Sequence, residues 1–393
     1  MKSASLTTNS LRMEAVQSPV VPIVADLIRE TPGTISLGQG VVCYGPPEAA
    51  LRNAIAHGAQ LDQFYGPVEG IPELAGVLTR KLADENRIDI GDERRLVITA
   101  GANMGFLNAL FAITDPGAEV ILPTPYYFNH EMAVRMLNCV PVSVPTDRHF
   151  QVDPATIAAA MTRRTAAVVT ISPNNPSGAV YPEETLQAIN ALCRERGIYH
   201  ISDEAYEYFV YDDRRHFSPA SLSDSTRHTI SLFSLSKAYG FSSWRIGYML
   251  IPARLFEAVR KVQDTNLICP PLASQYAAIG ALEAGRDFCD ERIRQLARNR
   301  QFVIGGLRKL DCIMDGVRSD GAFYVFIRLD TELPDMEVVE RLIRDFRIAV
   351  MPGSAFGMDD GCYLRISYGA LDEATLEQGM HRLVSGLNAT LSK

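Results

Sequence analysis

Short apolar runs alternate with helix-period segments across the middle of the chain. Six runs have the composition of strands: Leu96–Thr99, Glu119–Leu122, Pro141–Val144, Ala166–Ile171, Ile198–Ser202 and Thr229–Phe233. Three segments between them have apolar residues at helical spacing: Asn103–Ile113, Phe128–Leu137 and Pro182–Arg196. Strands that alternate with helices are typical of a mostly parallel sheet with helices on both faces, so the sequence predicts an α/β fold.

The pattern changes after Pro252. Helices are expected at Arg254–Asp264, Ala273–Leu310 and Asp372–Leu391, and strands near Ala322–Arg328, Ile348–Val350 and Tyr363–Ser367. This mixture predicts a smaller α+β unit beside the first. The chain has 393 residues, which is long enough for two domains with a large core.

Composition narrows the classes of function. The net charge is −8, so nothing favours binding to nucleic acid or to an anionic membrane. No apolar run approaches the roughly 20 residues that span a bilayer. The N-terminus has no signal-peptide core, and its Ser/Thr-rich start leaves an organellar transit peptide as the alternative to a cytosolic tail. Seven scattered cysteines are not spaced as metal ligands, so we expect reduced thiols in a cytoplasmic protein without a metal site.

The strongest chemical signal surrounds Lys237, in Ser-Leu-Ser-Lys-Ala-Tyr-Gly-Phe-Ser-Ser-Trp-Arg-Ile-Gly-Tyr. A lysine amine that is desolvated or held beside other charge can form Schiff bases. Ser234, Ser236 and Arg245 are the donors that a phosphate monoester needs. The segment therefore indicates a covalent anchor for an aldehyde cofactor that carries a phosphate. An ordinary surface lysine in a serine-rich loop is the alternative.

This segment resembles the lysine segment of class I and II aminotransferases, which are pyridoxal 5'-phosphate (PLP) enzymes of fold type I. The resemblance extends from about Ile35 to Tyr368, with the motifs in the family's order. It implies that Lys237 carries PLP. It also implies a large PLP-binding domain over residues 46–285, a small C-terminal domain over 286–393, and an N-terminal arm over 1–45 that joins the small domain.

A second motif, Thr-Ala-Gly-Ala-Asn-Met-Gly, lies between an expected strand and an expected helix. Open α/β sheets bind ligands at the carboxyl edge of their strands, and N–H groups at a helix N-terminus bind phosphate. The resemblance assigns Gly101, Ala102 and Asn103 to the cofactor phosphate. A glycine in such a turn is also common for backbone reasons alone.

Two motifs at later strand ends are expected to hold the cofactor ring. In Pro-Thr-Pro-Tyr-Tyr, the resemblance places Tyr127 on the face of the ring, with Tyr126 as the second choice. In Asn-Asn-Pro-Ser-Gly, it assigns Asn175, rather than Asn174, as a donor to the phenolic oxygen of the cofactor. Two pocket tyrosines and a plain strand-ending turn are the alternatives.

An acidic pair follows another expected strand, in Ile-Ser-Asp-Glu-Ala-Tyr. PLP withdraws electrons well only while its ring nitrogen keeps a proton, and a nearby carboxylate raises the pKa of that nitrogen. The resemblance assigns Asp203, and not Glu204, to this role. It assigns Tyr206 to the phenolic oxygen. An exposed acidic turn is the alternative.

Substrate binding is expected around Arg365, in Cys-Tyr-Leu-Arg-Ile-Ser-Tyr. A buried guanidinium needs a partner, and it forks onto a carboxylate with two hydrogen bonds. The resemblance therefore assigns Arg365 to the α-carboxylate of the substrate, together with Gly38 and Asn175. The landmark segments Gly321–Tyr324 and Val350–Gly357 are expected to be structural.

Tyr65, in Phe-Tyr-Gly-Pro-Val-Glu-Gly, resembles a tyrosine that reaches the cofactor phosphate of the other subunit. Without the resemblance it would be an ordinary turn aromatic. The resemblance implies a homodimer with shared active sites.

The motifs predict an aminotransferase, which exchanges an amino group between an amino acid and a 2-oxo acid by ping-pong kinetics, with Lys237 as general base and acid. A carbon–sulfur lyase, or another elimination or oxidation on the same scaffold, needs the same residues and is the alternative. A transcription regulator is less favoured, because the stretch before Ile35 is too short for a DNA-binding domain.

The loop Val41–Tyr44 is neutral and no cation for a distal carboxylate is identifiable. Neutral or aromatic amino acids are therefore expected over aspartate, with glutamate and 2-oxoglutarate as the partner pair.

Overall fold

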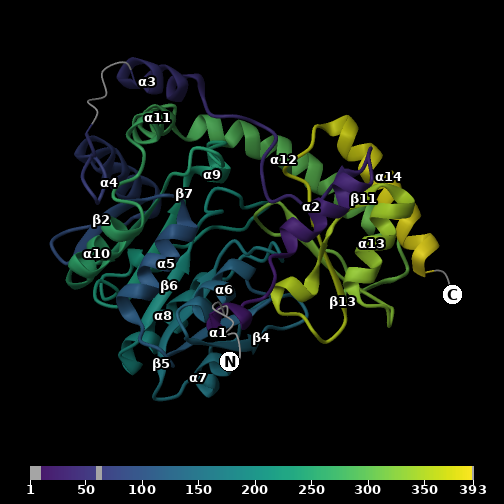
Figure 1. Ribbon diagram of the computed structural model, residues 1–393, viewed down its shortest axis with the longest axis horizontal. Coiled ribbons are helices and arrows are strands. Elements are labelled where there is room, and N and C mark those ends of the chain that lie inside the picture. The colour runs from purple at the N-terminus through teal and green to yellow at the C-terminus, as the bar shows by residue number, and fades with distance from the viewer. Residues whose placement is uncertain (1–9, 59–63, 392–393) are drawn as a thin grey trace, which may run out of the picture.

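The structure is a computed structural model that describes residues 10–58 and 64–391. Two lobes lie side by side, a larger one around a seven-stranded sheet and a smaller one around a four-stranded sheet (Figure 1). Among the described residues, no helix has both the length and the apolar character that a membrane crossing requires.

The large sheet has the strand order β2-β8-β7-β6-β5-β3-β4. The strands are β2 (Arg94–Thr99), β3 (Glu119–Thr124), β4 (Val140–Pro145), β5 (Thr165–Ile171), β6 (Tyr199–Asp203), β7 (Thr229–Ser234) and β8 (Gly247–Pro252). Only the two pairings of β8, with β2 and with β7, are antiparallel. The six strands that the sequence predicts are present, whereas β8, a strand buried at every residue, was missed.

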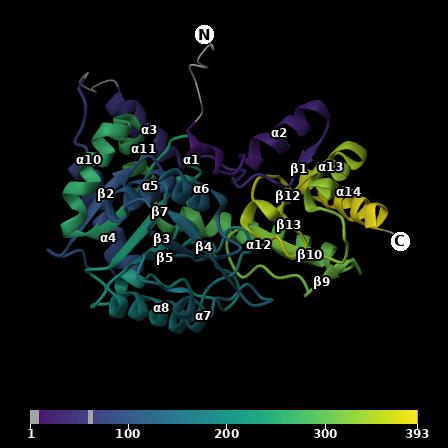
Figure 2. The same cartoon turned by 60° about the horizontal axis from the view of Figure 1, so that its bottom comes forward.

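Helices cover both faces of this sheet, as predicted for an α/β fold (Figure 2). On one face, α5 (Ala102–Ile113), α6 (Phe128–Met136) and α10 (Phe256–Asn266) share an apolar core with the strands. On the other face, α7 (Pro154–Ala160) and α8 (Glu183–Arg196) form a second core. Loops and helix starts at the carboxyl ends of the strands carry the site described below.

The small sheet has the antiparallel order β12-β13-β10-β9. Its strands are β9 (Ile313–Met314), β10 (Tyr324–Leu329), β12 (Met351–Pro352) and β13 (Cys362–Ser367), and its helices are α13 (Asp335–Phe346) and α14 (Glu373–Leu391). A separate parallel pair joins β1 (Ile35–Ser36) to β11 (Ile348–Ala349). The N-terminal segment therefore packs with the C-terminal part of the chain; the exact domain boundaries stay a prediction.

The expected single helical stretch Ala273–Leu310 is two helices, α11 (Leu272–Glu283) and α12 (Gly285–Leu307). The break lies at Gly285, whose φ of +73° is a left-handed conformation that glycine adopts without strain. The other helices are α1 (Leu11–Glu14), α2 (Val20–Glu30), α3 (Glu48–Gly58), α4 (Pro72–Asn86) and α9 (Leu235–Ala238). α12 runs between the lobes, and α2 packs on α13 and β12 (Figure 1).

Candidate active site

A cavity of about 410 Å³ lies between the lobes, where β5, β6 and β7 of the large sheet end opposite β10 and β13 of the small sheet. It is lined by every predicted site residue except Gly101 and Tyr65. These lining residues are Gly38, Ala102, Asn103, Tyr127, Asn175, Asp203, Tyr206, Ser234, Ser236, Lys237, Arg245 and Arg365. Residues far apart in sequence are thus brought to one cavity.

Lys237 lies on the short helix α9, which begins directly after β7. The Ser234 side chain caps this helix by accepting a hydrogen bond of 3.1 Å from the backbone N–H of Ser236. The Lys237 Nζ donates to the carbonyl oxygen of Gly40 at 2.5 Å. The amine is therefore held inside the cavity, against the N-terminal loop.

The surroundings of Lys237 favour its neutral form. Burial, together with the positive charges of Arg365 and Arg245, lowers the pKa of the amine from 10.5 to about 8, against the opposing effect of Asp203. A neutral amine is both a nucleophile and a base. Lys237 thus has a much larger reactive fraction at moderate pH than a lysine in water.

An anion cradle is formed by Arg245, two serines and the N-terminus of α5. The Arg245 Nη1 lies 3.3 Å from the Ser236 hydroxyl. The guanidinium reaches the start of α5 only because residue 101 is glycine. A Cβ there would lie 2.2 Å from the Arg245 Nη2, and the φ of Gly101 is +81°. Gly101 therefore serves the cradle without lining the cavity, and the donors together fit a phosphate monoester.

Asp203 ends β6 and points into the cavity, where a histidine holds it. Its Oδ1 accepts from the backbone N–H of Ala205 at 3.1 Å, and its Oδ2 lies 3.1 Å from the His130 Nε2. His130 is buried on α6 and stacks on Phe106 with ring centroids 3.9 Å apart. The sequence analysis missed His130, because a histidine within a helix carries no local signal of the strand end that it will meet.

Glu204, the rival acid, does not line the cavity. Its carboxylate accepts hydrogen bonds from the His216 Nε2 at 2.9 Å and from the Ser218 hydroxyl at 2.5 Å. It is 1% exposed. The geometry is therefore consistent with Asp203 as the acid that meets a ligand, while Glu204 belongs to a buried polar network.

The two adjacent tyrosines have different surroundings. Tyr127 lines the cavity, and its hydroxyl accepts from the Asn129 side chain at 2.9 Å. Tyr126 packs instead against Gly357, where a Cβ would lie 2.5 Å from its ring. Burial raises the pKa of Tyr127, so its hydroxyl stays neutral and its ring offers an apolar face to the cavity.

The two adjacent asparagines also differ. Asn174 is turned into its own loop, where its Oδ1 accepts from the backbone N–H of Ser177 at 3.0 Å. Asn175 faces the cavity, and its Oδ1 accepts from the Arg365 Nη1 at 2.8 Å. The first choice of the sequence analysis thus lies in the cavity in each of these adjacent pairs.

Arg365, on the buried strand β13, is held in one orientation. Its Nη1 contacts Asn175 and its Nη2 donates to the carbonyl oxygen of Gly38 at 2.7 Å. Its guanidinium carbon lies 4.7 Å from the ring centroid of Tyr324 and 4.9 Å from that of Phe356. The Nε is buried and has no hydrogen-bond partner in the described part of the chain. Because a buried donor without a partner is costly, this edge fits a carboxylate ligand.

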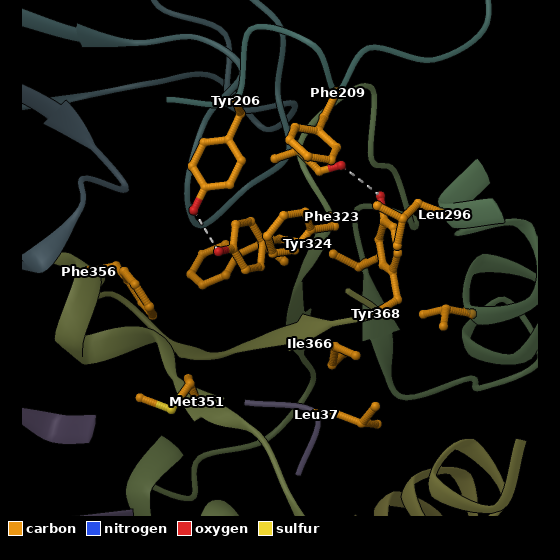
Figure 3. Packing of buried hydrophobic residues seen from close by; sticks show 14 of the residues in the cluster. Leu37, Tyr206, Phe209, Leu296, Phe323, Tyr324, Met351, Phe356, Ile366 and Tyr368 are labelled. Carbon is orange, nitrogen blue, oxygen red and sulfur yellow. Dashed lines mark hydrogen bonds between the residues drawn. The ribbon is translucent and has the colours of Figure 1, made fainter. Parts of the chain in front are cut away.

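Several parts of the wall were not predicted, and three of them matter for the function. Tyr324, expected to be structural, lines the cavity, and its hydroxyl lies 2.7 Å from that of Tyr206 (Figure 3). Met351, also from a segment expected to be structural, lines it too. The third part is an apolar side of α2 formed by Val21, Val24, Ala25 and Ile28. The apolar spacing of α2 was a usable signal, but it did not indicate which surface the helix covers.

Tyr65 does not line the cavity of its own chain, and it is 79% exposed. Its predicted contact with a partner subunit stays a prediction.

The fold and the site define a PLP-dependent aminotransferase. The family model described as aminotransferase class I and II matches residues 32–383, and the chain belongs to that family. The family confirms the predicted cofactor, PLP, and the predicted enzyme class.

Individual relatives are named either as aspartate or aspartate/prephenate aminotransferases, or as aromatic aminotransferases. A probable aspartate/prephenate aminotransferase of Aquifex aeolicus is 36% identical over 94% of this chain and 96% of its own length. An aromatic aminotransferase of Arabidopsis thaliana is 34% identical over 97% of both chains. Neither the sequences nor the solved structures favour the lyase alternative.

Solved structures agree with this division. An aspartate aminotransferase from Thermus thermophilus with maleate superposes with a TM-score of 0.90 at 32% identity, over 97% of this chain and 100% of that one. An aromatic aminotransferase from Pyrococcus horikoshii gives a TM-score of 0.86 at 33% identity, over 93% and 99%. The names therefore include both acidic and aromatic substrates.

Proposed function

We propose that this aminotransferase exchanges an amino group between a neutral or aromatic amino acid and a 2-oxo acid by a ping-pong mechanism. The observation that carries this proposal is the set of charges around the cavity. Lys237, Arg245 and Arg365 are the only lysine and arginine side chains on its described wall. Each has a role at the cofactor or at the α-carboxylate, so none is left for a distal carboxylate. The α2 side of the wall is apolar, which suits an apolar substrate side chain.

The cavity residues offer a partner for each group of PLP: the phosphate, the face of the ring, the ring nitrogen and the phenolic oxygen. Arg245, Ser234, Ser236 and the start of α5, including Asn103, would hold the phosphate, and Tyr127 would cover a face of the ring. Asp203 would meet the ring nitrogen, and Asn175 and Tyr206 would meet the phenolic oxygen. When bound, PLP supplies an electron sink that makes the Cα proton of the amino acid acidic.

The proton transfer is assigned to Lys237. Its amine, with a pKa lowered to about 8, would take the Cα proton as a base and then give it to the cofactor carbon as an acid within the same half-reaction. Arg365 fixes the α-carboxylate, and Asn175 and the Gly38 carbonyl hold the guanidinium. His130 holds the Asp203 carboxylate, which would meet the ring nitrogen. Together these contacts would bring the Cα–H bond within reach of the lysine.

We also propose a homodimer in which Tyr65 reaches the partner's cofactor phosphate. Four apolar side chains of α3 and of residues 64–65 are exposed: Leu51 at 41%, Ile55 at 75%, and Phe64 and Tyr65 at 79% each. Exposed apolar side chains that gather in one stretch are typical of interfaces. A cytoplasmic location stays a prediction.

A substrate screen tests the proposed specificity. Each amino acid is added alone to the holoenzyme, and the cofactor absorbance reports conversion to the amine form. Neutral or aromatic amino acids should give at least about tenfold higher rates per concentration than aspartate, since an unpaired distal carboxylate in an apolar wall is costly. Aspartate as the best substrate would refute the specificity. Continued release of ammonia and 2-oxo acid without a second substrate would refute transamination.

A further inference from the structure

Tyr324 stands where the cofactor side and the substrate side of the cavity meet. It is the first residue of β10, which pairs with β13 so that Phe326 lies opposite Arg365. Side chains two positions apart lie on the same face of a strand, so Tyr324 projects from the face that carries Arg365. The residue is fully buried from solvent and lines the cavity.

The hydroxyl of Tyr324 is paired with that of Tyr206 at 2.7 Å, as Figure 3 shows. In such a pair one hydroxyl donates, and the other keeps its own proton for a different acceptor. Burial raises the pKa of Tyr206 well above its ordinary value. Burial also raises the pKa of Tyr324, but only to about 12, because the charge of Arg365 and the hydrogen bond to Tyr206 oppose it. Both hydroxyls therefore stay protonated. Because a hydroxyl has one proton to donate, a Tyr206 that donates to a bound acceptor must accept the 2.7 Å hydrogen bond from Tyr324.

Two further contacts fix the Tyr324 side chain. Its ring lies under the Arg365 guanidinium, 4.7 Å from centroid to carbon, which is a cation–π distance. Its hydroxyl abuts Gly40, where a Cβ would lie only 2.6 Å away. The carbonyl oxygen of Gly40 accepts the hydrogen bond of Lys237. Tyr324 thus contacts three groups. These are Gly40, which holds the lysine, Arg365, which is proposed to bind the α-carboxylate, and Tyr206.

We propose that Tyr324 is a positioning residue that donates its proton to Tyr206 and so directs the Tyr206 proton toward the phenolic oxygen of the bound cofactor. The inference rests on the proposed function, which places that oxygen beside Tyr206. Other titratable or charged groups at this part of the cavity are Asp203, Lys237, Arg245, Arg365 and Tyr127. They are unchanged in the variants below.

The test is a pH titration of the visible absorbance of the resting holoenzyme, which needs no turnover. A hydrogen bond donated to the phenolic oxygen stabilises its negative charge and weakens proton binding at the nitrogen that joins Lys237 to the cofactor. Tyr324→Phe should raise the pH midpoint of this absorbance change by up to about 0.4 to 1 pH unit, the equivalent of one ordinary hydrogen bond. Tyr206→Phe should raise it at least as much.

The double variant decides whether Tyr324 acts through Tyr206. Tyr206→Phe with Tyr324→Phe should have the same midpoint as Tyr206→Phe alone, whereas additive shifts would overturn the inference. Tyr211→Phe is the matched control. Its buried hydroxyl donates to the Ala322 carbonyl at 2.7 Å, beside the same strand but outside the cavity. Its midpoint should stay that of the wild type, and an equal rise would also overturn the inference.

Gly40→Ala gives an independent route if Tyr324→Phe does not fold. The added methyl group must displace the Tyr324 hydroxyl, so the midpoint should rise in the wild-type background and not in Tyr206→Phe. An unchanged midpoint in both Tyr324→Phe and Gly40→Ala would refute this inference and leave the substrate screen unaffected. A raised midpoint in an enzyme that transaminates no amino acid would refute the proposed function alone.

Discussion

Replacing Arg365 with lysine tests whether one buried guanidinium binds the α-carboxylate of every substrate. The wild-type side chain contacts Asn175 through Nη1 and the Gly38 carbonyl through Nη2, and still has a buried Nε without a partner among the described residues. Lysine keeps the charge but has a single nitrogen. It cannot hold both protein acceptors and also fork onto a carboxylate.

The expected loss follows from the hydrogen bonds. A charge-assisted hydrogen bond contributes about 1.5–3 kcal/mol, so the loss of one should lower kcat/KM by about 10-fold to about 150-fold. The loss should be alike for a neutral amino acid, an aromatic amino acid and a 2-oxo acid. A simple amine without a carboxylate should be a poor substrate of the wild type and should lose little in the variant.

Steady-state kinetics on these four compounds, and on aspartate as a dicarboxylic substrate, measure the effect. Arg328→Lys is the matched control, because that guanidinium also lies over an aromatic ring, 5.5 Å from the centroid of Tyr363, but outside the site cavity. It should change kcat/KM by no more than about twofold, as is usual for substitutions away from a site. Impairment of dicarboxylic substrates alone by Arg365→Lys would refute the assignment. Arg365 would then read the distal group, and the preference for neutral side chains would fall too.

Four further predictions follow from the same cavity. Borohydride reduction and peptide mapping should place the pyridoxyl group on Lys237, and Lys237→Ala should lose about 100-fold or more in rate while still binding PLP through its phosphate; label on another lysine would contradict this. In the apoenzyme, modification of Lys237 by an amine-selective reagent should rise with pH around a midpoint of about 8, because its lowered pKa frees the amine there; a midpoint near 10.5, the ordinary value, would contradict the burial argument. Asp203→Asn should slow the half-reaction by about 100-fold or more, whereas Glu204→Gln should mainly lower thermal stability, and equal rate losses would show that the wrong acid was chosen. Mixing inactive Lys237→Ala and Tyr65→Ala chains should restore some activity in hybrid dimers, and no rescue despite proven subunit exchange would remove Tyr65 from the partner's site.

Local sequence patterns were sufficient for six of the seven strands of the large sheet, and the family resemblance supplied the roles of most site residues. The resemblance chose Asn175 and Asp203 rather than Asn174 and Glu204, and the chosen residues line the cavity. The positions of the strands and helices that carry these motifs depend on backbone geometry over a few residues. The periods of strand and helix express that geometry directly.

Only the tertiary structure decided which distant residues meet. Arg365 contacts Gly38 across 327 positions of sequence, and His130 meets Asp203 although neither segment signals the other. The position of β8 between β2 and β7 likewise depends on how buried surfaces pack, since an all-buried strand has no polar side to orient it. The sequence alone determined which chemical groups are present and the local backbone conformation that carries them. Tertiary packing decided their partners, because a charge or donor needs a partner only where the two lobes bury it.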